Sequence, residues 1–220
     1  MLFRSQAEQG FKQAIELNPR YGVAHYWYSC YLAAVGRTEE SVVEIARAHE
    51  LAPLSLMTNA NVGRVLYFAR RYDEAIAQCR KTLDIEPTFF LAHAVLGLAC
   101  THEGMHEDAV SAFQKAMTFS GGLPYTAAGL GYALARAGKK AEAQGVLADL
   151  TERSRHQYVP AFCAAMVQVG LGNTDEAFAW LARAYEERSN WLAYAKVWPL
   201  IDDLRSDARF TALLRKVGVQ

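Results

Sequence analysis

A 34-residue internal period runs through the chain, and this period constrains the fold more than any other feature of the sequence. An acidic residue precedes five of six small residues that recur at this spacing, and an apolar residue follows each of the six after four positions. Several columns in one phase indicate a repeated structural unit rather than chance. The small residues are Ala7, Ser41, Ala75, Ala109, Ala143 and Ala177.

Each repeat has the pattern of two amphipathic helices joined by a turn. Apolar residues recur at three- and four-residue spacing on both sides of the turn, which is the helical period. The acidic column falls in the first turn of the second helix, where the helix dipole favours a carboxylate. The pattern predicts an all-α protein with about thirteen helices and no sheet. The turn column holds Gly36, Arg70, Gly104, Gly138 and Gly172.

A helix–turn–helix unit with this period resembles the tetratricopeptide repeat. The resemblance implies a right-handed α-solenoid with three parts. Residues 1–19 form a lone second helix of an incomplete repeat, and residues 190–220 form a C-terminal capping segment over the last apolar face. Between them, residues 20–189 form five units, at about 22–55, 56–89, 90–123, 124–157 and 158–189. The fifth unit rests mainly on the stretch LGNTDEAFAWLARA.

Two stretches also resemble a narrower group of proteins. YARRYDEAIAQCRKTLDIEP and RSDARFTALLRKVG are similar to the C-terminal tetratricopeptide regions of bacterial multidomain regulators. In that group the array follows a winged-helix domain, a Ser/Thr kinase domain or an adenylate cyclase domain. The resemblance implies the sensory or scaffold part of a bacterial signalling protein.

Composition argues against several classes of partner and location. Lys and Arg together number 23, as do Asp and Glu, so the net charge is zero and non-specific nucleic-acid binding is disfavoured. The same balance disfavours a polybasic membrane surface. No run of 18 apolar residues or signal-peptide pattern occurs, which predicts a cytoplasmic chain without membrane contact. Four unpaired cysteines are expected in the core: Cys30, Cys79, Cys100 and Cys163.

The sequence carries no recognisable catalytic or metal-binding motif. It lacks a Gly-rich phosphate loop, a nucleophile elbow and a paired-cysteine zinc pattern. His102 and His106 are four residues apart, but Gly104 is a turn residue, so they do not share a helix face. His25 and His93 are interpreted as packed histidines. We therefore expect no enzyme, no catalytic or metal-binding residues and no cofactor.

The resemblance implies a binding groove for a protein or peptide partner. In tetratricopeptide arrays the first helix of each pair lines the concave side. We expect Arg64, Tyr132 and Arg136 to face solvent and to contribute to binding without contributing to stability. A Lys/Asn clamp for a C-terminal carboxylate is not evident, since Asn61 alone resembles part of one. The expected groove residues are Tyr26, Cys30, Arg64, Tyr67, Phe68, Leu98, His102, Tyr125, Tyr132, Arg136, Phe162 and Met166.

Self-association is an alternative function. The N-terminal helix, about residues 5–18, has no partner helix of its own in the sequence, so Phe11, Ala14 and Ile15 would form an apolar stripe facing water. A second copy of the chain could cover this stripe and give a homodimer. The sequence leaves this alternative open beside peptide binding.

Overall fold

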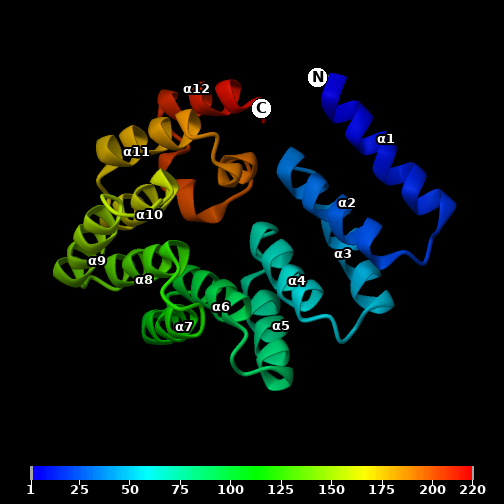
Figure 1. Ribbon diagram of the computed structural model, residues 1–220, viewed down its shortest axis with the longest axis horizontal. Helices are drawn as coiled ribbons and strands as arrows, with labels where there is room; N and C mark the ends of the chain where they lie inside the picture. The colour runs from blue at the N-terminus through cyan, green and yellow to red at the C-terminus, as the bar shows by residue number, and fades with distance from the viewer. Residues whose placement is uncertain (1, 220) are drawn as a thin grey trace.

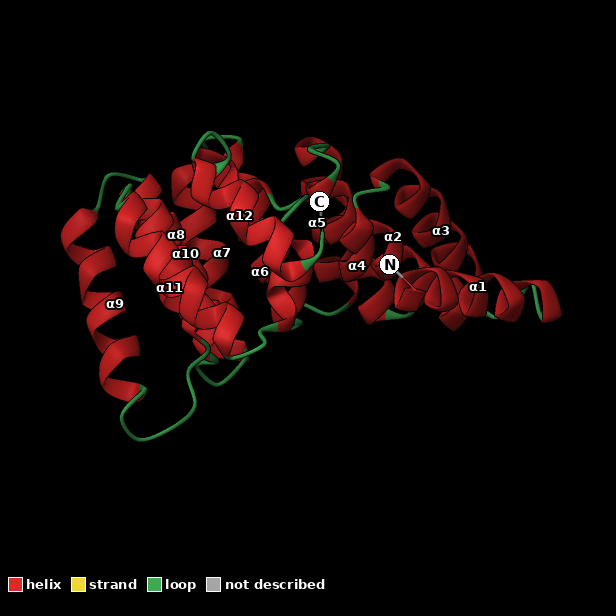
Figure 2. Cartoon of the chain, turned by 90° about the horizontal axis from the view of Figure 1, so that it is seen from above, coloured by secondary structure: helices red, strands yellow, loops and turns green. Residues whose placement is uncertain are grey.

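The computed structural model describes residues 2–219, and the side chains of residues 6–219. Within this part, twelve α-helices and two 3₁₀ helices occur and no strand does, which confirms the predicted all-α solenoid (Figures 1 and 2). The elements are α1 (Leu2–Leu17), α2 (Gly22–Val35), α3 (Thr38–Leu51), α4 (Leu56–Phe68), α5 (Tyr72–Ile85), α6 (Phe90–His102), α7 (His106–Phe119), α8 (Pro124–Arg136), α9 (Lys140–Arg153), α10 (Ala161–Leu171), α11 (Thr174–Glu186), η1 (Asn190–Tyr194), η2 (Pro199–Leu204) and α12 (Ala208–Val217).

Five helix pairs stack one after another into an arc. They are α2–α3, α4–α5, α6–α7, α8–α9 and α10–α11, and the first helix of each pair also contacts the first helix of the next. Both ends of the chain lie on the open side of the arc (Figure 1). The even-numbered helices α2 to α10 therefore form the concave side, as the family resemblance implies.

Small residues at the repeat columns let neighbouring helices approach closely. Ala75 and Ala109 of the small column are completely buried. The ring of Phe113 from α7 lies between Gly97 of α6 and Gly129 of α8. A Cβ atom on Gly97 or Gly129 would lie 2.5 or 2.1 Å from a Phe113 ring atom, so only glycine fits at these positions. The repeat pattern thus encodes packing as well as helix boundaries.

Arg70 adopts a turn conformation that glycine adopts in the other pairs. Gly36, Gly104, Gly138 and Gly172 have φ values from 74° to 86°, in the left-handed region. Arg70 has φ 60° in the equivalent turn between α4 and α5. This conformation is unfavourable for a residue with a Cβ atom, so contacts elsewhere must compensate for it.

The expected C-terminal cap divides into two parts with different positions. Helix α12 packs against α11, as a cap would. Residues 190–205, which we call the inner segment, instead turn back into the space inside the arc and contact α2 and α10 (Figure 1). Trp198 of the inner segment is only 2% exposed. The expectation that 190–220 simply covers the last apolar face is corrected here, because the apolar side chains of the inner segment bury against the concave side.

Helix α1 packs on α2 without becoming part of the core. The Phe11 ring lies 5.8 Å from the rings of both Tyr28 and Tyr31. The Glu8 carboxylate accepts hydrogen bonds from Arg37 at 2.6 Å and from the Tyr28 hydroxyl at 3.1 Å. None of residues 6–17 is fully buried. No helix in the described part of the chain is long and apolar enough to cross a membrane.

Candidate partner-binding surface

Aromatic stacking holds the inner segment against the concave side. Trp191 stacks on Tyr125 with ring centroids 4.6 Å apart and planes at 5°. Tyr194 stacks on Phe68 at 5.4 Å. Trp198 contacts both Phe68 and Phe162, at 5.8 and 5.1 Å. Buried aromatic pairs of this kind contribute about 1 kcal/mol each beyond the area that they bury. The inner segment is therefore an integral part of the folded domain.

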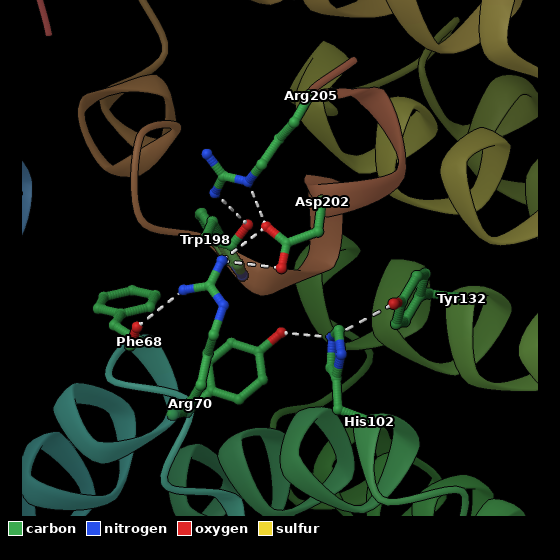
Figure 3. A network of polar contacts seen from close by, with 8 residues as sticks. Phe68, Arg70, His102, Tyr132, Trp198, Asp202 and Arg205 are labelled. Atoms are coloured by element: carbon green, nitrogen blue, oxygen red, sulfur yellow. Dashed lines mark hydrogen bonds and ion pairs between the residues drawn. The ribbon is translucent and has the colours of Figure 1, made fainter. Parts of the chain in front are cut away.

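Two ion pairs join the inner segment to the turn after α4 and to the last residue of α8. Both carboxylate oxygens of Asp202 accept from Arg70 at 2.8 Å, and Asp202 also pairs with Arg205 (Figure 3). Asp203 accepts from Arg136 at 2.8 Å. Asp202 and Asp203 thus pair with arginines that are distant in the chain.

His102 lies under this contact, between two tyrosines. Its Nε2 atom lies 3.0 Å from the Tyr67 hydroxyl and 3.4 Å from the Tyr132 hydroxyl (Figure 3). Burial lowers the pKa of His102 to about 4, so the ring is neutral at pH 7. In the tautomer with the proton on Nδ1, the single Nε2 lone pair accepts from the nearer hydroxyl, that of Tyr67. No group of described residues is arranged to bind a metal ion, and His106 begins the next helix.

The structure brings the expected groove residues to one side but covers most of them. Tyr132 is 1% exposed, so the expectation that it faces solvent is wrong. Arg136 is exposed and already pairs with Asp203. The reason in both cases is the inner segment, which carries apolar and acidic side chains onto the concave side. The buried members are Cys30, Tyr67, Phe68, Leu98, Tyr132, Phe162 and Met166, and the half-buried members are Tyr26, Arg64, His102 and Tyr125.

The N-terminal halves of α2 and α4 keep apolar side chains exposed. Val23, Trp27 and Met57 are 51%, 55% and 49% exposed. The Tyr26 ring lies edge-on to Trp27 with centroids 5.1 Å apart. Sequence reasoning missed these three exposed residues, although Val23 and Met57 occupy equivalent positions one period apart. A small cleft nearby is lined by Tyr26, Met57, Ala60, Asn61, Arg64, Leu91 and Val95. We call Val23, Trp27, Met57 and this cleft the open surface.

Arg64 brings an unpaired charge to the open surface. Its guanidinium lies 5.7 Å from the Tyr194 ring centroid and donates to Cys30 Sγ at 3.6 Å. No carboxylate of the described residues forms an ion pair with Arg64, and its Nε atom has no hydrogen-bond partner there. Asn61, also in the cleft, has an unpartnered Oδ1 atom. The cleft therefore combines apolar walls with polar groups that are not satisfied within the chain.

Comparison with known proteins agrees with the architecture. No curated protein matches the chain in sequence. Among solved structures, PilW, described as a type IV pilus biogenesis factor, superposes with a TM-score of 0.65 at 18% identity, covering 88% of this chain and 90% of that one. PilF from Pseudomonas aeruginosa gives 0.59 at 18% identity, with 88% of each chain covered. MamA from Desulfovibrio magneticus RS-1 gives 0.59 at 21% identity, over 70% of this chain and 87% of that one.

These likenesses concern the fold. A family model provides the stronger statement, because it matches residues 53–197, which is more than half of the chain. The model describes the tetratricopeptide repeat, in agreement with the 34-residue period and the stacked helix pairs. The chain belongs to the tetratricopeptide repeat family.

Proposed function

We propose that this array binds a peptide or helix of a protein partner on the open surface of its concave side. Tetratricopeptide arrays serve as protein–protein interaction or scaffold modules, and the proposal concerns where this one binds. The exposed Val23, Trp27 and Met57 support it, because adjacent exposed apolar side chains are typical of interaction sites. The proposal assigns the chain no catalytic role and no cofactor.

The unpaired Arg64 is the observation that carries this proposal. A half-buried guanidinium without a carboxylate loses hydration that the Cys30 thiol and the Tyr194 ring replace only in part. A partner that presents a carboxylate to Arg64 and an apolar side chain to Tyr26 and Met57 would supply both missing contacts. Arginine beside aromatic side chains is also the composition of binding hot spots. The expected partner segment is therefore acidic and apolar.

The inner segment limits the length of this site. It covers the parts of the concave side near Phe68, Phe162 and Tyr125 with its own aromatic rings. A partner can thus use the N-terminal halves of α2 and α4 and the cleft beside Leu91 and Val95 of α6 while the domain stays intact. Of the expected groove residues, Tyr26 and Arg64 remain the best candidates for contact.

Selection from a peptide display library tests the proposal. We expect selected peptides to combine an acidic residue with an aromatic or aliphatic one. Arg64→Gln and Trp27→Ala should each weaken their binding by about tenfold, the effect of losing a charge-assisted hydrogen bond or a buried aromatic contact. Tyr185→Ala is the matched control, because Tyr185 is an exposed aromatic residue on α11. Peptides that bind both open-surface variants as tightly as the unchanged chain would place the site elsewhere.

We also propose that the array is part of a cytoplasmic bacterial signalling protein. The support is the similarity of RSDARFTALLRKVG and the YARRYDEAIAQCRKTLDIEP stretch to regulators of that kind. The coding sequence upstream of Met1 tests this. An in-frame winged-helix, kinase or cyclase domain would support it, and an unrelated reading frame with its own stop codon would contradict it.

Self-association remains the second candidate function. Its support is α1, in which none of residues 6–17 is fully buried and Leu17 is 80% exposed. Light scattering over a range of concentrations should then show a dimer, and Ile15→Glu with Leu17→Glu should shift it to monomer. A strictly monomeric unchanged chain would exclude this candidate.

A further inference from the structure

One position in the first helix of each of the first three helix pairs holds a buried polar residue. In the first two pairs this side chain contacts two polar partners. His25 Nε2 lies 3.1 Å from the Pro19 carbonyl, and its Nδ1 lies 2.6 Å from the Glu44 carboxylate. Asn59, one period later, donates to the Pro53 carbonyl at 2.7 Å and accepts from Gln78 at 2.8 Å. In both pairs the second partner comes from the second helix of the same repeat.

The third pair keeps the polar residue and lacks its second partner. His93 Nε2 lies 2.8 Å from the Pro87 carbonyl, as in the first two pairs. The position one period after Gln78 is Ala112, whose methyl group cannot form a hydrogen bond. His93 Nδ1 therefore has no hydrogen-bond partner among the described residues. Water does not replace that partner readily, because His93 is only 5% exposed. An unsatisfied buried polar atom of this kind is unfavourable and rare in folded proteins.

A cavity lies where the missing side chain would be. It has a volume of about 470 Å³ and lies between α5, α6 and α7. His93 and Ala112 both line it, and Ala112 stands two periods after Glu44, which meets the Nδ1 atom of His25 in the first pair. The remaining walls are Arg80, Leu83, Pro87, Leu96, Cys100, Asp108, Ser111, Lys115 and Phe119.

The charges of the cavity favour an anion. Arg80 of α5 and Lys115 of α7 bring two positive charges to it. Asp108 lies 3.8 Å from Arg80 and offsets part of its charge. Lys115 forms no ion pair with any described residue. Beside these groups, Leu83, Leu96 and the partly exposed Phe119 provide an apolar wall.

We propose that this cavity binds a carboxylate attached to an apolar chain, with the carboxylate taking the place of Glu44 against His93. The carboxylate would lie between His93 Nδ1 and Lys115, and the apolar chain would lie against Leu83 and Phe119. Both a small carboxylic acid and a glutamate side chain of another protein have this chemistry. The site is separate from the concave side and does not depend on the function proposed above.

Binding at this site takes up a proton. Since His93 Nε2–H donates to Pro87, a neutral ring presents a lone pair at Nδ1, and a carboxylate can pair there only after Nδ1 is protonated. Burial and Lys115 lower the pKa of free His93, whereas a bound carboxylate would raise it. The charged or titratable residues that line the cavity with His93 are Arg80, Cys100, Asp108 and Lys115. Binding should therefore tighten as the pH falls from about 8 to 6.

Nuclear magnetic resonance of the histidine ring nitrogens tests the proposal on the full chain. We expect the Nδ1 signal of His93 to shift on addition of pentanoate or of the blocked peptide acetyl-Leu-Glu-Leu-amide. His25 is an internal reference, because its Nδ1 is already paired with Glu44. A response to pentanoate alone identifies a small acid, and a response to the peptide alone identifies a protein side chain; either supports the site. The absence of a response to either ligand, or an equal response to pentanamide, would overturn the proposal.

Ala112→Glu is the decisive variant. It places in the third pair the carboxylate that Glu44 supplies in the first, so it should occupy the site and weaken pentanoate or peptide binding by about tenfold or more. Ala112→Gln copies the second pair and should also block the site. If either variant folds poorly, His93→Ala removes the hydrogen-bonding atom and should weaken binding similarly. Unchanged binding in the folded variants would contradict the proposed position of the carboxylate.

Discussion

The Arg70 guanidinium holds both carboxylate oxygens of Asp202 at 2.8 Å, across 132 positions of sequence. Arg70 occupies the one turn of the repeat column in which glycine is absent. Its left-handed backbone is therefore linked to the contact that joins the inner segment to the turn between α4 and α5. The ion pair with Asp202 gives a physical reason for arginine, rather than glycine, at this position of the repeat.

Arg70→Gly should separate backbone strain from the ion pair. Glycine relieves about 1 kcal/mol of conformational strain, and the exposed ion pair contributes about 0–1 kcal/mol, so overall stability should change little. Hydrogen exchange of residues 190–205 should nevertheless become faster. Arg71→Ala is the control, because Arg71 is the N-cap residue of α5 and pairs with Glu74 in its first turn. Unchanged exchange in the inner segment would mean that Asp202 does not help to hold it.

Trp198→Ala should destabilise the domain by about 3–5 kcal/mol, because it removes a large buried side chain and leaves a cavity. Thermal or denaturant unfolding measures this loss. Tyr158→Ala should change the free energy of unfolding by less than about 0.5 kcal/mol, since Tyr158 is 70% exposed. Equal effects of the two variants would show that the inner segment is not part of the cooperative core.

Gly129→Ala and Gly145→Ala should have opposite effects. A Cβ atom on Gly129 would lie 2.1 Å from the Phe113 ring, so overpacking should cost about 1–3 kcal/mol. Gly145 lies in α9 with open space around it, and alanine there should stabilise the helix by about 0.5–1 kcal/mol. Melting temperatures of the pair measure both effects. Stabilisation by both substitutions would refute the position of Phe113 between α6 and α8.

Acid should destabilise the protein partly through His102. Its pKa is about 4 when folded, below the ordinary value of 6.5, so the unfolded chain binds the proton more readily. Stability from the neutral ring is present above pH 6.5 and is lost as the pH falls towards 4. His102→Gln keeps an acceptor for the tyrosine hydroxyls and should show a shallower loss of melting temperature over this range. His93, whose pKa is also lowered, remains in both proteins and so does not affect their difference. An identical pH dependence of the two proteins would contradict this role of His102.

Much of the helical architecture could be predicted from the sequence because its causes are local. The apolar spacing, the acidic first turns and the glycine turns each act within one repeat or between adjacent repeats. The small column has its physical reason in close helix contacts, as the complete burial of Ala75 and Ala109 shows. Helix α1 is likewise present near its expected position, at Leu2–Leu17.

The candidate sites were harder to predict because they depend on contacts without a fixed spacing. The family resemblance implies that Tyr132 lies on the concave side, but it cannot show that Trp198 and its neighbours bury against that side. His93 was correctly interpreted as packed, yet its missing partner became evident only when Glu44 and Gln78 were seen to pair with the equivalent residues.

The sequence by itself determined the helices, their pairing and the side of each helix that faces inward, since a 34-residue period repeats the same local interactions. Only the tertiary structure decided what covers the inward side. Residues 190–205 lie outside the period, and their position follows from burying Trp191 and Trp198 against helices far away in the chain. That gain in apolar burial depends on the assembled arc, so no local pattern encodes it.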